Sequence, residues 1–202
     1  MPVKEIFSLA AVILTLFAYF PYLRSIHRGL TRPHVFSWLI WSLSTFIIFV
    51  AQIHAGGGVA VWPIGLSGLI TFYIAVLAYH KKSDISIMTL DYVFLLLALL
   101  AIPIWLLTAN PLWAVILITL VDIFGFGPTL RKAYYYPEQE NRNFYLLFFI
   151  RCIFVILALE TYSLTTILFP SAIGLSCLSM TLMLMFRTDR TAIRKISNRS
   201  TT

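Results

Sequence analysis

Charged residues, cysteines and metal-ligand motifs are all scarce in this chain. Only 11% of its 202 residues are charged and 60% are hydrophobic, a balance that excludes an ordinary soluble globular domain. The two cysteines, Cys152 and Cys177, fall within apolar segments, so we interpret them as buried side chains without a redox role. The four histidines lie at segment ends or in loops without metal-ligand spacing. The sequence therefore predicts no metal site and no cofactor.

Groups that would carry catalysis are missing as well. No nucleophile lies beside a base, no carboxylates are paired, and the last apolar segment lacks the lysine that a retinal Schiff base needs. The glycines at 56–58 form a turn without the strand and helix context of a phosphate-binding loop. We therefore predict that the chain is not an enzyme.

The sequence does contain a series of long apolar segments. A helix needs about 20 residues to cross a bilayer, and seven segments match that requirement. They cover residues 6–26, 35–53, 59–79, 88–108, 111–130, 143–160 and 163–186. The connections are short, and the first segment is too long for the apolar part of a signal peptide. The predicted fold class is an all-α integral membrane protein with seven transmembrane helices.

Positive charge is concentrated on alternating connections, and the net charge is +7. Thirteen of the 15 Lys and Arg residues follow the first, third, fifth and seventh segments: Arg24, Arg28, Arg32, Lys81, Lys82, Arg131, Lys132, Arg142, Arg187, Arg190, Arg194, Lys195 and Arg199. The positive-inside rule then predicts an N-terminus outside and a cytoplasmic C-terminus. We interpret the basic residues as contacts with the lipid bilayer, not nucleic acid. The short loops and the lack of a sorting signal favour a bacterial or archaeal plasma membrane.

A gapless register of 107 residues relates the two halves of the chain. It matches Pro21, Leu23 and Arg24 with Pro128, Leu130 and Arg131, and also Phe17 with Phe124, Tyr19 with Phe126, Trp62 with Phe169 and Pro63 with Pro170. We interpret the chain as one three-helix module written twice, at residues 1–86 and 111–188. Residues 87–110 would be an unpaired linker helix, which makes the repeats parallel, and residues 189–202 a basic cytoplasmic tail.

The run from Pro21 to Trp38 resembles the first-repeat signature of the PQ-loop and SWEET transporter superfamily, with a basic stretch, Gly29 and Thr31 between its ends. The run from Gly127 to Lys132 is similar to the second signature. The resemblance covers nearly the whole chain and implies a 3+1+3 helix layout around a central substrate cavity. Tyr22 and Thr129 stand in place of the family's glutamine, and the third and seventh segments lack the asparagine of sugar-transporting members.

The prolines of the first and fifth segments are candidate gating hinges. Pro21 and Pro128 each remove a backbone hydrogen bond, which bends or breaks a helix. Pro63 and Pro170 lie in the first turn or two of their segments, where proline is tolerated. We therefore predict that Pro21 and Pro128 hinge the gates and that the other two prolines are structural.

Two ionisable residues, Asp122 and Arg151, lie near the predicted bilayer midplane, where a charge costs about 2.5–3.5 kcal/mol. Their equivalents in the first repeat are Thr15 and Ser44. Three interpretations stand side by side. The two charges form a structural ion pair, or Arg151 binds an anionic group of the substrate, or Asp122 is a proton site coupled to gating.

Further candidates for contact with a solute are Trp41, Ser67 and Ser176. Trp41 is either a stacking wall for a planar ligand or part of an interfacial aromatic belt, and for Trp38 the sequence favours the belt. Ser67 and Ser176 are among the polar residues of the third and seventh segments.

Taken together, these patterns predict a transporter that moves a small polar solute, such as a sugar or an amino acid, by alternating access. The cavity would be lined by the first, second, fifth and sixth segments. A vitamin-precursor carrier similar to the nicotinamide riboside family is an alternative, and so is a receptor or trafficking protein on the same fold. Proton coupling and homo-oligomer formation are left open by the sequence.

Overall fold

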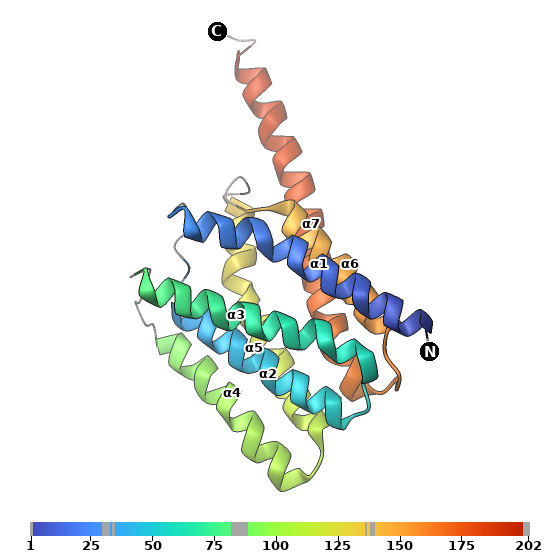
Figure 1. The fold of residues 1–202 in the computed structure, drawn as a ribbon. Helices are drawn as coiled ribbons and strands as arrows, with labels where there is room; N and C mark the ends of the chain where they lie inside the picture. Colours follow the sequence, from blue (N-terminus) through green and yellow to red (C-terminus); the bar gives the residue numbers. More distant parts are fainter. Residues whose placement is uncertain are drawn as a thin grey trace.

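The computed structural model describes residues 2–29, 33, 35–81, 89–135, 137 and 140–199, and secondary structure in this part of the chain is helical throughout (Figure 1). At residues 2, 91, 128, 129, 131, 132 and 188–199 it describes the backbone alone. The helices are α1 (Pro2–His27), α2 (Val35–His54), the short 3₁₀ helix η1 (Gly58–Val61), α3 (Trp62–His80), α4 (Thr89–Thr108), α5 (Pro111–Tyr135), α6 (Arg142–Leu157) and α7 (Leu164–Arg199).

Several of these helices are long and apolar enough to cross a membrane. Four stretches meet that requirement: Val3–His27, Val35–His54, Gly58–His80 and Leu164–Arg187. Two shorter apolar helices cover Tyr92–Thr108 and Pro111–Gly127. The chain is therefore a membrane-embedded helical protein. Each of the seven predicted segments coincides with a helix, and their number as membrane spans stays a prediction.

The sixth and seventh predicted segments differ from the helices that form. Asn141 caps α6 by accepting hydrogen bonds from the backbone N–H groups of Asn143 and Phe144. The helix ends at Leu157, after 16 residues, or about 24 Å, which is shorter than a bilayer core of about 30 Å. The backbone of α7 instead stays helical to Arg199, beyond the predicted end at residue 186. No glycine or proline interrupts residues 187–199, so nothing stops the helix there, and it projects from the bundle (Figure 1).

Burial in the bundle is inverted relative to a soluble protein. Leu107 of α4 is 86% exposed and Phe17 of α1 is 66% exposed, whereas Arg151 and Gln52 are buried at 4% and 0%. Soluble proteins place charged and amide side chains outside and rarely bury them without partners. A surface of Leu and Phe that encloses the few charged and amide side chains is what a lipid environment favours.

The helices pack in two groups. The third helix, α3, packs against both α1 and α2, and α7 packs against both α5 and α6. Between the groups, α1 contacts α6 and α2 contacts α5, while α4 lies along α5 and α2. This arrangement gives two interhelical seams, α1–α6 and α2–α5, that run through the middle of the bundle (Figure 1).

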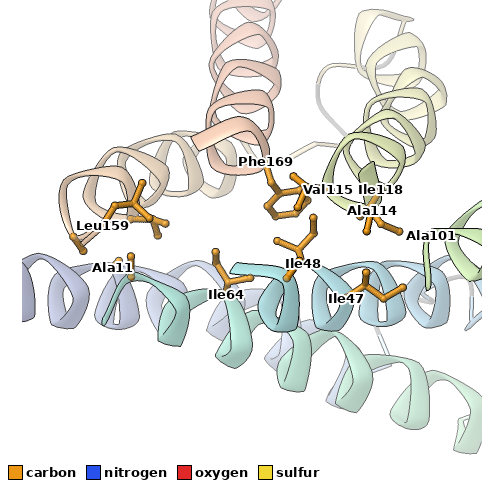
Figure 2. Packing of buried hydrophobic residues seen from close by; sticks show 14 of the residues in the cluster. Ala11, Ile47, Ile48, Ile64, Ala101, Ala114, Val115, Ile118, Leu159 and Phe169 are labelled. Carbon is orange, nitrogen blue, oxygen red and sulfur yellow. The ribbon is translucent and has the colours of Figure 1, made fainter. Parts of the chain in front are cut away.

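Two apolar clusters fill the bundle, one toward each end. We call the end that contains the start of α1 the Lys4 end and the opposite end the Arg24 end. The Lys4-end cluster contains Ala11, Ile48, Ile64, Val115, Val155 and Phe169 (Figure 2). The Arg24-end cluster contains Tyr19, Trp38, Ile74, Phe148, Cys177 and Met180. Thr15, Ser44, Ser67, Asp122 and Arg151 lie between these cluster members along their own helices, so a polar layer separates the two clusters.

The predicted hinge prolines do not break their helices. Pro21 lies inside α1, which continues to His27, and the backbone of α5 continues through residue 128 to Tyr135. The side chain of Pro128 lies outside the described residues. Neither helix is broken in this conformation, and the bending of the helices and the role of the prolines as hinges stay predictions. Pro63 occupies the first turn of α3 and Pro170 the second turn of α7, as expected.

Candidate functional site

Arg151 is the centre of the polar layer. Its guanidinium is buried among three helices: Nε donates to Thr15 Oγ1 of α1 at 2.9 Å, and Nη2 donates to Ser67 Oγ and to the Pro63 carbonyl of α3 at 2.9 and 2.8 Å. Its carbon Cζ also lies 5.3 Å from the centroid of the Phe148 ring. A buried charge requires this degree of hydrogen bonding to offset its lost hydration. Arg151 of α6 is thereby tied to two helices of the other group.

Asp122 lies on the second seam, between α2 and α5. The two helices run antiparallel there. Ile48 and Val115 share the Lys4-end cluster, and a Cβ added to Gly125 would lie 3.7 Å from Trp41 Nε1 nearer the Arg24 end. Between these contacts, Ser44 of α2 lies beside the Asp122 carboxyl. Asp122 is half-buried, and its Oδ1 atom and Ser44 Oγ are both enclosed. The two residues are close without meeting the geometry of a hydrogen bond.

The two seams are reciprocal in the 107-residue register. Thr15 corresponds to Asp122, and Ser44 corresponds to Arg151. Arg151 contacts Thr15 across one seam, and Asp122 lies beside Ser44 across the other. Each charged residue thus faces the neutral equivalent of the other. The described residues contain no ion pair between Asp122 and Arg151, so the ion-pair interpretation does not hold in this conformation.

Two further residues belong to this layer and were missed by the sequence reasoning. Tyr19 is 5% exposed, and its ring meets Phe148 edge to face with centroids 5.2 Å apart, at the border of the layer. Thr119 is 3% exposed and lies one turn before Asp122. Helical spacing could have identified them, because residues three or four apart share a helix face. Tyr19 follows Thr15 by four residues, and Thr119 precedes Asp122 by three.

An aromatic group covers the polar layer toward the Arg24 end. Trp38 and Trp41 of α2 meet edge to face with ring centroids 5.3 Å apart, and Tyr22 stacks on Trp38 at 5.1 Å. Trp38 is only 8% exposed, so its assignment to a lipid-facing belt is wrong. Adding 107 to positions 38 and 41 reaches Tyr145 and Phe148 of α6, which are also buried in this cluster.

Hydrogen bonds join the two helix groups at the Lys4 end. Lys4 Nζ of α1 donates to the Leu159 carbonyl, just after α6, at 2.7 Å. Within the first group, Ser8 Oγ donates to the Val59 carbonyl at 2.6 Å. Deeper in the bundle, the Gln52 amide Nε2 donates to the Thr166 carbonyl at 3.2 Å. The polar layer is therefore closed by hydrogen bonds toward one end and by aromatic packing toward the other.

The Gln52 contact explains how Pro170 is accommodated inside α7. Proline has no N–H, so the Thr166 carbonyl four residues earlier lacks its helical donor. The Gln52 amide replaces that donor. We expect Gln52→Leu to lower the free energy of unfolding in the wild-type chain by about 1 kcal/mol more than it does in a Pro170→Ala variant. In that variant, the alanine at position 170 supplies the N–H that proline lacks. Thermal unfolding of the four variants in detergent measures this coupling, and equal costs in both backgrounds would refute it.

The remaining candidate residues are placed as follows. Trp41 is half-buried within the aromatic group. Ser176 is half-buried on α7, and its hydroxyl makes no hydrogen bond with the polar layer in the described structure. Among the residues that the structure describes, no cluster of three His, Cys, Asp or Glu side chains could hold a metal ion.

Comparison of the chain with protein-family models, with curated proteins and with solved structures finds no match.

Proposed function

We propose that this protein is a membrane transporter that carries a small polar solute between two three-helix halves by alternating access. The halves would be α1–α3 and α5–α7, with α4 as the linker helix, as in the PQ-loop and SWEET-like layout that the sequence resembles. The solute would bind at the polar layer. The observation that carries the proposal is the buried Arg151, which bridges the halves through Thr15 and Ser67 in the middle of an apolar bundle.

The cost of this polar layer supports a functional role. An arginine at the centre of a membrane helix is expensive, and a bundle that needed only stability would fill the same space with apolar residues. Nε and Nη2 of Arg151 are engaged by Thr15, Ser67 and the Pro63 carbonyl. A guanidinium has five N–H donors in a planar fork that matches a carboxylate or phosphate, which suits it to hold a solute oxygen.

The closures on either side of the layer support alternating access. The Lys4 end is held by polar contacts between the halves, namely Lys4 with the Leu159 carbonyl and Gln52 with the Thr166 carbonyl. The Arg24 end is held by the aromatic side chains of Trp38, Tyr145 and Phe148. Rocking of one half against the other about the two seams would open one closure at a time and leave the polar layer in place.

A ligand screen followed by a flux assay tests the proposal. Purified protein in detergent is heated with sugars, amino acids, carboxylates, nucleosides or vitamin precursors, and a binder of the folded state raises the midpoint temperature by mass action. The labelled binder is then followed in counterflow across proteoliposomes. We expect saturable counterflow in the wild-type protein, reduced about tenfold or more in Arg151→Lys, because lysine lacks the guanidinium fork that makes the three observed bonds.

The matched control is Thr45→Val, which changes another buried hydroxyl of the membrane interior that bonds only to the Trp41 carbonyl of its own helix. Counterflow in this variant should stay near the wild-type rate. Absence of stabilisation by every class would overturn the small-solute proposal. Saturable binding without counterflow would replace the transporter with a receptor on the same fold.

A further inference from the structure

The buried hydroxyl groups of this bundle fall into two kinds. Most threonines bond back to the carbonyl four residues earlier on their own helix, which is the usual way to satisfy a hydroxyl in an apolar environment. Among the buried threonines, Thr15, Thr45, Thr71 and Thr181 do so, at 2.7, 2.7, 2.9 and 2.8 Å. Ser44 Oγ and Thr119 Oγ1 are buried as deeply and make no hydrogen bond among the described residues.

The two exceptional hydroxyls lie on the two helices of the α2–α5 seam, where Asp122 is half-buried. Ser44 of α2 lies beside Asp122 of α5, and Thr119 is one turn from Asp122 on the same face of α5. The Asp122 Oδ1 atom is itself buried without a partner. Three buried side-chain oxygens without hydrogen bonds thus lie on these two helices, and burying such groups is costly unless something satisfies them.

We infer that Ser44, Thr119 and Asp122 bind a monovalent metal cation, for which sodium is the fitting ion. Carboxylate and hydroxyl oxygens are ligands for hard cations, and hydroxyl lone pairs can point at a metal where they cannot all point at one another. A protonated Asp122 carboxyl could serve a neighbouring hydroxyl as donor or acceptor, but it would leave its own share of the three oxygens to be matched pair by pair. A bound cation uses all three oxygens at once.

The charge balance selects a monovalent ion. One carboxylate and one sodium ion are neutral together, whereas a divalent ion would leave a positive charge in the membrane interior. The buried Arg151 already carries one positive charge on the neighbouring seam, where Thr15, Ser67 and the Pro63 carbonyl supply its oxygens. The two seams would then each hold one cation on oxygen ligands, a guanidinium on one side and a metal ion on the other.

In the transporter that we propose above, this site would bind the coupling ion, a role that rests on the proposed function. The binding of sodium itself does not depend on that function. The site joins one helix from each half, so its occupancy would change whenever the α2–α5 seam opens. Binding can therefore be measured on the detergent-solubilised chain without any solute or flux, and a negative flux assay would leave that measurement standing.

The experiment compares thermal unfolding in sodium chloride with unfolding in choline chloride at equal ionic strength. We expect sodium to raise the wild-type midpoint by about 3–6 °C at ten times its dissociation constant, and potassium to raise it less. The increment should disappear in Asp122→Asn and fall in Ser44→Ala and in Thr119→Val. Direct binding of radiolabelled sodium to the same preparations gives the stoichiometry, with one ion per chain expected for the wild type.

The control variant is Thr45→Val, which removes a hydroxyl adjacent in sequence to Ser44 but already bonded to its own helix. It should keep the full sodium increment. Because each increment is a difference between two salts, a variant with a changed baseline stability stays informative, and three variants guard against one that fails to fold. Equal midpoints in sodium and choline would overturn the site. So would a sodium effect that survives in Asp122→Asn, or a stability that follows pH and ignores sodium.

Discussion

Thr15→Val is expected to lower the stability of this protein by about 1.5–3 kcal/mol, although valine has nearly the shape of threonine. The substitution removes the oxygen that accepts from Arg151 Nε at 2.9 Å. Thr15 is fully buried, so water cannot replace the acceptor and the charged N–H is left without a partner. Thermal unfolding in detergent should show a midpoint lower by about 3–12 °C.

A double-mutant cycle separates this cause from lost packing. In an Arg151→Met background the charge is gone, and Thr15→Val should then cost only a few tenths of a kcal/mol. The Thr45 hydroxyl contacts no charged group, so Thr45→Val should cost the same in the wild-type and Arg151→Met backgrounds. An equal cost of Thr15→Val in both backgrounds would mean that the Arg151 contact contributes nothing to stability.

Gly65→Leu is the second change for which we expect a large effect, namely loss of the folded bundle. Gly65 lies where α3 crosses α2, and a Cβ at this position would lie 2.8 and 2.9 Å from two carbon atoms of the Phe49 ring. Even Gly65→Ala should therefore cost about 1–3 kcal/mol through overpacking, and leucine adds three more carbon atoms to the same contact. The yield of monodisperse protein and its unfolding midpoint in detergent report the loss.

Gly127→Ala is the matched control for this substitution. A Cβ at Gly127 of α5 would meet no atom within 4 Å, so alanine should be tolerated or should stabilise by about 0.5–1 kcal/mol through helix propensity. Phe49→Leu should rescue Gly65→Ala in part, because the smaller side chain vacates the space of the ring. If Gly65→Ala proved as stable as the wild type, the close α2–α3 crossing would be wrong.

The extent of the helices was largely readable from the sequence, because each depends on local features. Apolar runs interrupted by short polar connections indicate membrane helices, and all seven predicted segments coincide with helices. The errors occur at the ends. The predicted segment 143–160 continues beyond Leu157, where α6 ends, since an apolar run does not reveal where the backbone leaves the helix. Pro21 does not break α1, which is continuous to His27, and a bend at Pro21 stays a prediction.

The candidate site was only half visible in the sequence. Asp122 and Arg151 could be identified because a charge in an apolar segment is costly, and the register supplied Thr15 and Ser44 as their equivalents. The sequence did not reveal that the hydroxyls of Ser44 and Thr119 lack hydrogen bonds, because most buried threonines of this chain bond to their own helix. Which hydroxyls do so depends on what the neighbouring helix presents to them.

The sequence by itself determined that this is a helical membrane protein with two ionisable groups in its interior, because hydropathy and helix propensity act within about 20 residues. Only the tertiary structure decided how those groups are used. Arg151 bonds to a residue 136 positions away, and Asp122 lies beside Ser44 instead of Arg151. These partners follow from which helices pack together across the two seams, and side-chain packing between distant segments is not encoded in any local pattern.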